Sequence, residues 1–515
     1  MQSVIDAFSV EETASSRQVA QSTLLSWNKS LLSSIRIFTI GVSTIGGSDV
    51  IGGTDVYASA WNKYQYTDES SYVTALSYER ALNQPIGGMV KALADIKMDN
   101  TSGRFTPRYA GGSSAIFTAV GKPRRPVIIN AGFNFNGIDN LIPQFVGVTS
   151  KSPKIDMRNR SVEFMAEDFI GFLQNQYVDQ SAMFTGLRSD EVIENLLVQA
   201  GFSTSQYDLD YGINRIKFGE FQPGDKFGDI INKIAQAEFA NFYQDEQGKL
   251  RYENRQHWTQ YPHFNVQRVI TTAQVINAET PDTEHIINVV EVKSKPRGKQ
   301  PQQLVWKLSG TIEIPGSSDK EVFVNFDDPM LEVLTPQFYT ANSDPGGSGT
   351  DLTSNVTVKS FTKFARAAKI IFTNSSTSTA HITSMELYGR PAKVEQEIYY
   401  REQDSSSRTA YEERVYAIEN EYIQDTSWAQ SFARMVLQDF SEPENIQKLT
   451  IRAVPELQLG DLISWQGRYW RIFGIKTKMD ASGGFTQEID ILQRTPVTYF
   501  RIGISTIGGS DQIAP

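Results

Sequence analysis

Histidine is the first residue type to test for chemistry, because its imidazole can ligate metals and transfer protons near neutral pH. Four histidines occur, and only His257 and His263 lie close together, at the two ends of the stretch HWTQYPH. A zinc site needs more closely spaced ligands with cysteine or carboxylate partners, and the chain has no cysteine. We therefore interpret the histidines as loop or surface residues and expect no bound metal.

Paired carboxylates are the second candidate, since a glycosidase uses two of them to cleave its substrate. Asp327 and Asp328 are adjacent, and Asp208 lies two positions before Asp210. Such enzymes usually draw their two carboxyls from separate strands, so this spacing does not indicate an active site. The sequence also has no G-x-S-x-G, H-E-x-x-H or G-x-x-x-x-G-K-[ST] motif. These patterns predict a protein that is not an enzyme and has no cofactor.

The charge of the chain argues against specific nucleic-acid binding. The formal net charge is −10, whereas proteins that grip DNA carry basic patches that neutralise phosphates. No basic run is longer than Lys122-Pro123-Arg124-Arg125. A surface past which DNA slides would favour acidic character, because like charges repel. Short apolar runs and the polar N-terminus further predict no transmembrane segment and no secretion signal.

The elements that position these residues change in kind along the chain. With 515 residues, several domains are expected. Residues 1–34 are predicted to form an N-terminal helical segment, because Val19, Leu24 and Leu31 follow helical spacing. Short β-rich runs bounded by Gly, Asn and Pro then predict a first β-barrel domain over 35–186.

Two helices and a hairpin predict a small α+β module over 187–258. The run SDEVIENLLVQAG begins at a candidate N-cap, Ser189 or Asp190, and stops at Gly201. A second amphipathic helix is expected over 224–240. The run FYQDEQGKLRYENR then places a turn between two alternating strands, which is typical of a hairpin.

Strands at regular spacing with polar turns predict an inserted β-sandwich over 308–391. The insertion separates the two parts of a second β-barrel domain, 259–307 and 392–497, which includes a helix at 426–440. Residues 498–515 are assigned to a C-terminal docking segment. The predicted fold is thus mainly β with α+β modules: two tube-like β-barrels, a small helix-plus-hairpin module and an inserted β-sandwich.

Three stretches carry motifs in a fixed order. Residues 100–107 read NTSGRFTP and precede a strand introduced by Pro126, residues 225–255 form the helix-plus-hairpin stretch, and residues 455–461 read PELQLGD. Together they resemble the minor tail proteins and the tail-tip or baseplate hub proteins of long-tailed phages. The turn residues of this resemblance are Gly103, Arg104, Phe105, Pro107, Gly460 and Asp461. Physically they are structural, because glycine frees the backbone and aspartate caps its own turn.

The resemblance implies a structural hub, a ring-shaped homotrimer that closes the distal end of the tail tube. Two barrels in each of three subunits would mimic a sixfold ring. The implied partners are distal tail or tail-tube ring proteins, the tape-measure protein, and tip or fibre proteins. The implied location is the tail tip of the virion, assembled in the host cytoplasm, with roles in host attachment and viral genome ejection.

Two other functions stay open on the sequence. A host-receptor-binding adhesin would use the inserted β-sandwich, with a host surface glycan as its ligand, whereas the missing motifs disfavour a wall-degrading enzyme. The aromatic residues of the insertion alternate like core residues and give no distinctive exposed platform: Phe323, Phe326, Phe338, Tyr339 and Tyr388. We therefore expect a structural or neighbour-binding insertion, with glycan contact as the alternative.

The phrase FTIGVSTIGGSD at 38–49 recurs as FRIGISTIGGSD at 500–511, with ten of twelve positions identical. In each copy, β-favouring residues followed by paired glycines predict a strand that runs into a tight turn. Identity confined to these residues indicates that both copies meet the same kind of surface, as added strands or groove fillers. Duplication or two surface hairpins without partners are the alternatives, and the phrase has too few units for a calcium-binding β-roll. The docking residues of this hypothesis are Phe38, Ile40, Gly41, Ile45, Gly46, Gly47, Asp49, Phe500, Ile502, Gly503, Ile507, Gly508, Gly509 and Asp511.

Overall fold

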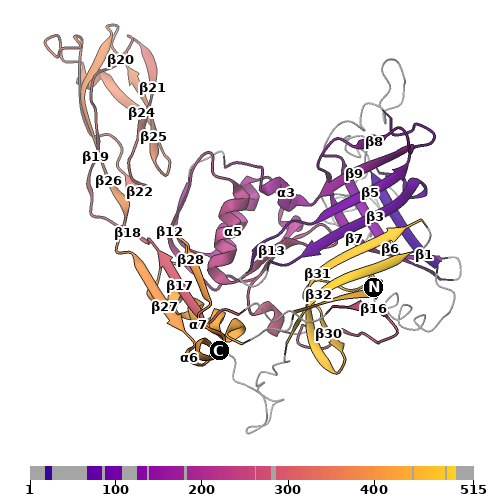
Figure 1. Ribbon diagram of the computed structural model, residues 1–515. Helices are drawn as coiled ribbons and strands as arrows, with labels where there is room; N and C mark the ends of the chain where they lie inside the picture. The colour runs from indigo at the N-terminus through magenta and orange to yellow at the C-terminus, as the bar shows by residue number, and fades with distance from the viewer. Residues whose placement is uncertain are drawn as a thin grey trace, which may run out of the picture.

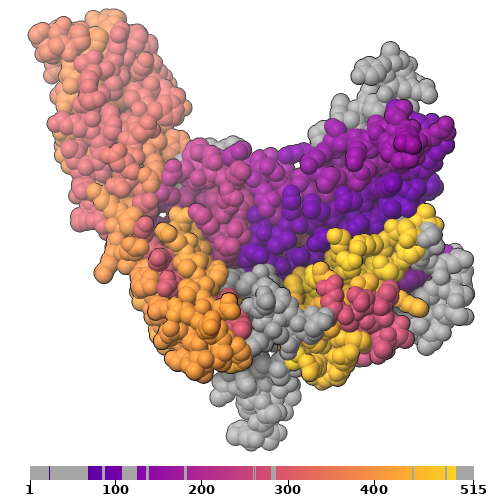
Figure 2. Space-filling model, viewed as in Figure 1, coloured from indigo at the N-terminus to yellow at the C-terminus, as the bar shows by residue number. Residues whose placement is uncertain are grey.

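The computed structural model describes ten stretches of the chain. These are residues 18–25, 66–83, 87–106, 124–135, 138–178, 182–260, 263–279, 286–442, 446–481 and 484–494. A large sheet and the inserted sandwich form two arms that diverge from a helical middle part (Figure 1). The arms also stand apart in the space-filling view (Figure 2). The described residues are therefore mainly β with α+β modules, as the sequence predicted.

The large sheet unites strands from both ends of the chain. Its order is β16-β29-β32-β31-β3-β5-β9-β7-β6-β1-β2, and β15, β30 and β8 lie beside this path. The early strands are β1 (Gln18–Leu25), β2 (Thr67–Asp68), β3 (Val73–Ala81), β5 (Leu93–Asp99), β6 (Pro126–Phe135), β7 (Ile138–Thr149), β8 (Lys154–Asp156) and β9 (Ser161–Glu167). The late strands are β15 (Arg268–Val269), β16 (Val275–Ala278), β29 (Ile446–Arg452), β30 (Leu462–Trp465), β31 (Arg468–Asp480) and β32 (Phe485–Gln493). Early and late strands meet where β3 pairs antiparallel with β31.

The large sheet buries two clusters of apolar side chains, one mainly from the early strands and one mainly from the late strands. On β5, Ala94, Ile96 and Met98 are buried while Asp95 and Lys97 are exposed, so alternation turns one face inward. These three residues belong to the cluster of the early strands. The late strands have their own cluster, which includes Leu449, Ile451, Trp470, Ile472 and Ile489. One hydrogen-bonded sheet thus spans two apolar clusters.

The helical prediction for residues 1–34 is wrong over Gln18–Leu25, which form strand β1. This strand pairs antiparallel with β6 along its full length, from Gln18 opposite Asn134 to Leu25 opposite Val127. A run of eight residues satisfies helical and extended spacing almost equally, and the hydrogen bonds offered by β6 decide between them. The other residues of 1–34 lie outside the described stretches.

The helical middle part is larger than the predicted module of residues 187–258, because elements from α3 to α7 share one buried cluster. Its elements are α3 (Phe169–Leu173), β10 (Ala182–Arg188), α4 (Ser189–Gln199), β12 (Arg215–Phe221), α5 (Phe227–Glu238), β13 (Asn241–Gln244), β14 (Leu250–Glu253), β17 (Val289–Ser294), β27 (Ile398–Gln403), α6 (Ser405–Tyr411), β28 (Val415–Glu419) and α7 (Thr426–Phe440). Helices α4 and α5 and the β13–β14 hairpin form where the sequence predicted them. Helix α7 begins after Asp425, whose side chain accepts a hydrogen bond from the Ser427 N–H.

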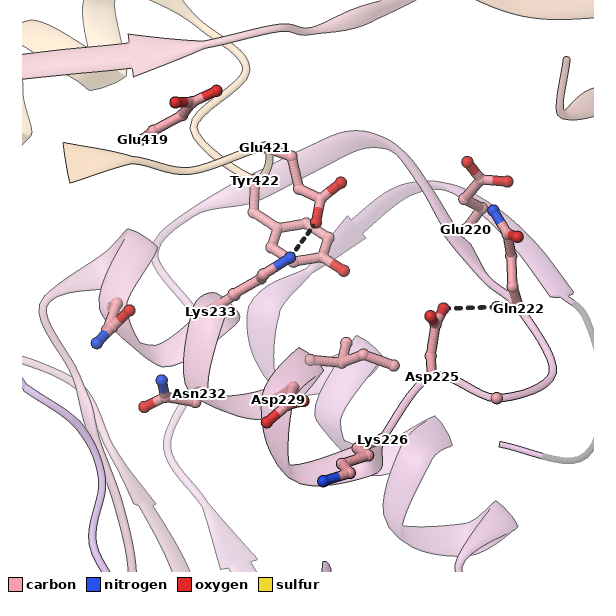
Figure 3. Close-up of a pocket in the computed structure, with 13 residues that line it drawn as sticks. Glu220, Gln222, Asp225, Lys226, Asp229, Asn232, Lys233, Glu419, Glu421 and Tyr422 are labelled. Carbon is pink, nitrogen blue, oxygen red and sulfur yellow. Dashed lines mark hydrogen bonds and ion pairs between the residues drawn. The ribbon is translucent and has the colours of Figure 1, made fainter. Parts of the chain in front are cut away.

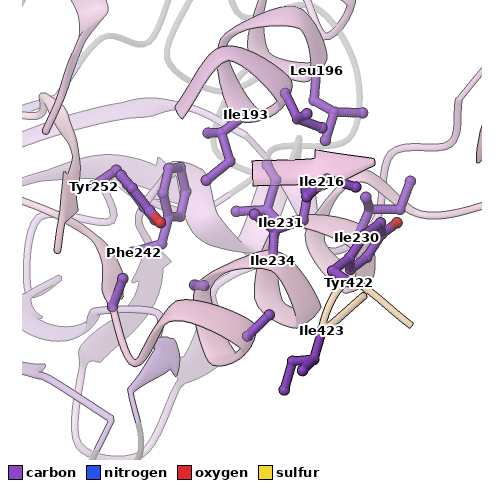
Figure 4. Close-up of a cluster of buried hydrophobic side chains, with 14 of the residues drawn as sticks. Ile193, Leu196, Ile216, Ile230, Ile231, Ile234, Phe242, Tyr252, Tyr422 and Ile423 are labelled. Carbon is purple, nitrogen blue, oxygen red and sulfur yellow. The ribbon is translucent and has the colours of Figure 1, made fainter. Parts of the chain in front are cut away.

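The structure corrects two domain boundaries in this part. Strands β17, β27 and β28 were expected in the second barrel, but they form a sheet of their own. That sheet and α7 share a buried cluster with α4 and α5, in which Val290 and Phe432 join Ile193, Ile231 and Phe242. Figure 4 shows the last three of these side chains. The indole N–H of Trp428 also donates to the carbonyl oxygen of Ala237 at 3.0 Å. The apolar face of α7 needed a partner, and α5 supplies it.

The inserted sandwich is longer than predicted. Its strands are β18 (Arg297–Lys299), β19 (Gln303–Lys307), β20 (Ile312–Ile314), β21 (Ser318–Asn325), β22 (Met330–Val333), β23 (Phe338–Asn342), β24 (Val356–Lys363), β25 (Ala367–Asn374) and β26 (Ala380–Val394). Because β18 pairs with the end of β26, the unit runs over 297–394 rather than 308–391. Its buried cluster draws only on residues of this unit, among them Ile314, Ile370, Phe372 and Leu387. We call this unit the sandwich arm.

The shorter elements complete the described chain. They are β4 (Gly88–Met89), β11 (Tyr207–Leu209), η1 (Ser70–Tyr72), η2 (Thr204–Gln206), η3 (His257–Thr259) and η4 (Thr353–Asn355). Strand β4 pairs with β13 in parallel, and this ties the early strands to the middle part. No helix in the described stretches is both long and apolar enough to cross a membrane.

Candidate functional site

The first motif turn follows β5 and is tied by its side chains to the residues just before β3. Gly103 has a φ of 71°, which favours glycine. The Arg104 guanidinium donates to both oxygens of the buried Glu69 carboxylate, at 2.7 and 3.0 Å. Phe105 is fully buried, and its ring meets that of Tyr72 edge to face with centroids 5.5 Å apart. This turn is structural, and Pro107 lies outside the described stretches.

The second motif turn is shaped by a tryptophan. Gly460 has a φ of 82°, and a Cβ on it would lie 1.6 Å from the Trp258 ring. The carboxylate of Asp461 accepts a hydrogen bond from the Gln458 N–H at 2.8 Å, which closes the turn. Burial raises the pKa of Asp461 to about 7, and Arg471 opposes this rise. The structure therefore requires glycine at position 460 for two independent reasons.

A buried network joins the second turn to the early strands. Nη1 of Arg80 on β3 lies 3.0 Å from Oε2 of Glu246, which follows strand β13. The other oxygen of Glu246 accepts a hydrogen bond from Nε2 of Gln458 at 2.9 Å. Beside it, Nε of Arg251 donates to Asp245 at 2.9 Å. The network holds the early strands, the hairpin and the late strands in one arrangement.

The two neighbouring histidines lie next to this network. Nδ1 of His257 is 2.9 Å from Asp210 Oδ2, and the His257 and His263 rings contact each other at a tilt of 38° with centroids 4.5 Å apart. Burial, together with the positive charges of His257 and Arg471, lowers the pKa of His263 to about 4. The described residues contain no group of three His, Asp or Glu side chains that could hold a metal. The arrangement is one of packing and hydrogen bonding.

The large sheet presents a polar face on the side away from its buried clusters. One row of this face crosses the seam between early and late strands: Leu93, Glu79, Lys476, Glu488 and Thr450. A second row contains Asp95, Ser77, Lys478 and Thr486. We call these two rows, with Lys97, Glu163, Lys448 and Asp490 beside them, the polar face.

Opposite charges alternate across the polar face. Nζ of Lys476 lies 3.1 Å from Glu79, across the β3–β31 seam. Lys478 pairs with Glu488 at 2.5 Å, and Lys448 lies 3.6 Å from Asp490. These ion pairs are exposed, so they stabilise the fold little. Their effect is to cancel positive potential across strands from both halves of the chain.

A groove lies on the helical middle part (Figure 3). Its cavity volume is about 690 Å³, and its walls come from β12, α5 and the segment after β28. Carboxylates outnumber the two lysines, Lys226 and Lys233, in its lining. The acidic residues of the groove are Glu220, Asp225, Asp229, Glu419 and Glu421. We call this site the acidic groove.

Glu220 connects the acidic groove to the sandwich arm. Both of its oxygens accept hydrogen bonds from the Arg366 guanidinium, each at 2.8 Å. Arg297, at the start of the arm, lies 3.4 Å from the same carboxylate. Arg366 and Arg297 both belong to the arm. One wall of the groove therefore anchors the arm to the middle part.

Exposed aromatic side chains mark the outer surfaces of the sandwich arm. Phe338 is 62 % exposed and Phe323 is 60 % exposed, so the prediction that both are core residues is wrong. The Phe338 ring meets that of Tyr388 edge to face, with centroids 5.9 Å apart. Phe326 is buried, as predicted. Strand alternation was visible in the sequence, but which face lies inward depends on the opposing sheet.

The structure brings together few of the residues that the sequence singled out. The two motif turns lie in different halves of the large sheet, and both copies of the repeated phrase lie outside the described stretches. Sequence reasoning missed Arg80, Glu246 and Tyr422. The charge alternation of β3, β5 and β31 was a usable signal for the polar face, because a strand exposes every second residue.

No family model and no curated protein matches this sequence. Solved structures that resemble it include a 43 kDa tail protein of prophage MuSo2 from Shewanella oneidensis, with 10% identity, a TM-score of 0.43, and coverage of 84% of this chain and 95% of that one. A tail protein from Neisseria meningitidis MC58 has 10% identity and a TM-score of 0.43, and the match covers 84% of this chain and 94% of that one. Prophage tail protein gp18 from Listeria monocytogenes EGD-e has 11% identity and a TM-score of 0.39, and the match covers 85% of this chain and 93% of that one. The proteins found are of the class that the motifs indicated, but these values are too low to assign a function.

Proposed function

We propose that this chain is a structural hub of a phage tail tip, which closes the distal end of the tail tube as a ring-shaped homotrimer. The observation that carries the proposal is the single sheet that joins early and late strands and presents one charge-balanced polar face. A protein wall around a channel needs a continuous polar surface on one side and a buried core on the other. One chain supplies both the polar surface and the buried core, because its own strands β3 and β31 pair at the seam.

The charges of the polar face suit a channel that DNA must pass. Basic residues that lack acidic neighbours would bind phosphate and slow a sliding duplex. Lys476, Lys478 and Lys448 each lie beside a carboxylate instead. The face is therefore polar enough to be hydrated, and these three lysines are neutralised locally.

The edges of the large sheet offer a way to close a ring. Within the described stretches, the sheet ends at β16 on one side and at β2 on the other, and neither outer edge pairs with another strand. Open edges are a template for pairing with another chain. Three copies joined through these edges would form the ring. Tail-tube ring proteins, the tape-measure protein, and tip or fibre proteins are the partners of this proposal.

The alternative function is a host-receptor-binding adhesin. The exposed Phe338 beside Tyr388 on the outer face of the sandwich arm favours it, because sugar rings pack against aromatic side chains. The hydroxyl of Tyr388 donates to Glu386 at 3.1 Å, so polar groups adjoin the aromatic pair. Host glycan binding by this surface is compatible with a hub role for the rest of the chain.

Cysteine cross-linking tests the ring directly, since the chain has no cysteine of its own. Ile276 on β16 and Asp68 on β2 are both exposed, so Ile276→Cys and Asp68→Cys place one thiol at each edge. In assembled tails, oxidation of the double variant is expected to give covalent trimers as the largest species. Each single variant serves as a control and is expected to stay monomeric. Only monomers from the double variant, or an unlimited ladder, would contradict a closed ring.

A further inference from the structure

We propose that the acidic groove binds the guanidinium group of an arginine side chain from a neighbouring polypeptide. The inference goes beyond the hub function, because it depends only on the residues of the groove. The groove is already formed within one chain, between α5 and the segment after β28. It is therefore open to study on the purified protein.

The hydroxyl of Tyr422 is the strongest sign of a missing ligand. Tyr422 is only 4 % exposed, and its hydroxyl points toward the side of the groove that carries Asp225 (Figure 3). Although its backbone is hydrogen-bonded, this hydroxyl has no hydrogen-bond partner in the described stretches. The hydroxyl is accessible from the groove, so a ligand with donor groups can hydrogen-bond to it.

The surroundings of Tyr422 determine the charge of the ligand. Burial is the main cause of the raised pKa of Tyr422, and the carboxylates of Glu421, Asp225 and Glu220 add to it. These three carboxylates line the groove together with Tyr422. A cation there would be attracted by any of them that is not already ion-paired, whereas a phosphate or carboxylate would gain no such attraction.

Two carboxylates are available to a cationic ligand. Glu421 is occupied by Lys233 at 2.9 Å, and Glu220 by the arginines of the sandwich arm. Asp225 is held in place by the Gln222 N–H, which donates to it at 2.8 Å, but it has no ion-pair partner in the described part of the chain. Asp229, in the first turn of α5, has no such partner there either. Asp225 and Asp229 are thus the open charges.

Arginine fits this arrangement better than a metal ion or a lysine. The described residues of the groove include no cluster of carboxylates with metal-ligand geometry. A guanidinium presents five N–H donors in a planar fork, so it can bond a carboxylate and the Tyr422 hydroxyl together. An ammonium group has fewer donors and a larger hydration cost.

The occupant of the groove would also sit beside the anchor of the sandwich arm. Glu220 forms the groove wall and binds Arg366 and Arg297 of the arm. A ligand guanidinium near Glu220 would share this carboxylate with the arm. The site therefore fits a neighbouring protein that must be positioned relative to the arm.

Calorimetry on the full-length protein tests the proposal. The probe is a short acetylated glycine–arginine peptide, and the control probe replaces arginine by citrulline, which has the same shape without the charge. We expect the arginine peptide to bind and the citrulline peptide to bind at least about tenfold more weakly, a change of one decade in Kd. Equal binding of both peptides, or no binding of the arginine peptide at millimolar concentration, would overturn the proposal.

Matched variants locate the binding. Tyr422→Phe removes only the hydroxyl, and Asp229→Asn removes one open charge; each is expected to weaken the arginine peptide several-fold. Asp139→Asn, on β7 in the other arm, removes the same charge and is expected to have no effect. Because the Tyr422 hydroxyl has no described partner, Tyr422→Phe should not lower the thermal unfolding temperature. An equal loss in Asp139→Asn, or none in the groove variants, would contradict the site.

Discussion

Arg80 and Glu246 form a buried ion pair across the junction of three parts of the molecule, with Nη1 and Oε2 3.0 Å apart. Arg80 lies on β3, whereas Glu246 follows β13 and also binds Gln458 of the late strands. Burial raises the pKa of Glu246, and the charge of Arg80 opposes this rise. The pair therefore holds the polar face and the helical middle part in a fixed relation.

Replacing Arg80 by methionine is expected to destabilise the protein strongly. The change leaves Glu246 buried without its cation, which costs about 3–5 kcal/mol in comparable sites. The exposed pair of Lys476 and Glu79 supplies the control, and Lys476→Met is expected to cost at most about 1 kcal/mol. Urea unfolding followed by tryptophan fluorescence measures both changes. Similar unfolding midpoints for the two variants would contradict a special role for the buried pair.

Gly460→Ala tests the turn that contacts Trp258. Alanine would have to adopt a positive φ, which costs about 1–2 kcal/mol, and its Cβ would collide with the indole ring, which adds about 1–3 kcal/mol. Gly467 is the matched control, because its φ is 73° and no atom lies within 4 Å of an added Cβ. Gly467→Ala should therefore show the backbone cost alone. Equal losses of stability would mean that the Trp258 contact does not matter.

The contribution of His263 to stability is expected to become unfavourable in mild acid. Its pKa is lowered from 6.5 to about 4, so between these values the unfolded chain takes up a proton that the folded protein does not. The contribution of His263 to stability therefore rises with pH across this range and is lost as the pH falls. Glu253, whose pKa burial raises to about 7, acts in the opposite direction.

Comparing the parent with His263→Asn isolates the histidine. The variant is expected to lose less stability than the parent when the pH is lowered from about 7 to about 5. Unfolding midpoints in urea at the two pH values give the comparison. An identical loss in both proteins would show that His263 is not held neutral in the fold.

The sequence predicted those elements correctly whose signals lie within the element itself. Helix α7 has an N-cap at Asp425 and apolar residues at helical spacing, so its span was predicted correctly. Strand β1 was missed because its partner β6 lies more than a hundred residues away. Contacts between distant segments decide such cases, and a single sequence does not display them.

The candidate sites show the same division. Gly460 could be singled out from its turn motif. Trp258, whose ring leaves no room for a Cβ at position 460, lies in another part of the chain. The pairing of Arg80 with Glu246 and the direction of the Tyr422 hydroxyl depend on how distant segments pack together. Charge alternation along β3 and β31 was visible, but their pairing was not.

Removal of the whole sandwich arm is expected to leave a folded protein. The Glu395 N–H donates to the Pro296 carbonyl at 2.9 Å, so deleting residues 297–394 joins two points that are already adjacent. The arm buries its own core, and the ion pairs that the middle part loses are those of Glu220 with Arg297 and Arg366. Deleting 310–391 instead would remove the part of β26 with which β19 pairs and leave β19 without a partner. Insolubility of the 297–394 deletion would show that the arm shares a core with the remainder, and lost host attachment by intact particles would support the adhesin alternative.

Removal of residues 496–515 tests the docking hypothesis for the repeated phrase. The truncation takes away one copy of the phrase and spares β32, which ends at Gln493. We expect a folded protein that no longer enters tails at the normal level. Replacing Phe500 and Ile502 by serine in the full chain is a milder change with the same expected defect. Normal incorporation of both variants would leave the phrase without a docking role.

An asymmetric electron cryomicroscopy reconstruction of the tail tip tests the hub proposal most directly. The account predicts three copies of this chain in a closed ring at the distal end of the tail tube. The polar face, with Glu79, Lys476 and Glu488, is predicted to line the central channel. A different number of copies, a position on the periphery of the tail, or a polar face turned away from the channel would contradict it.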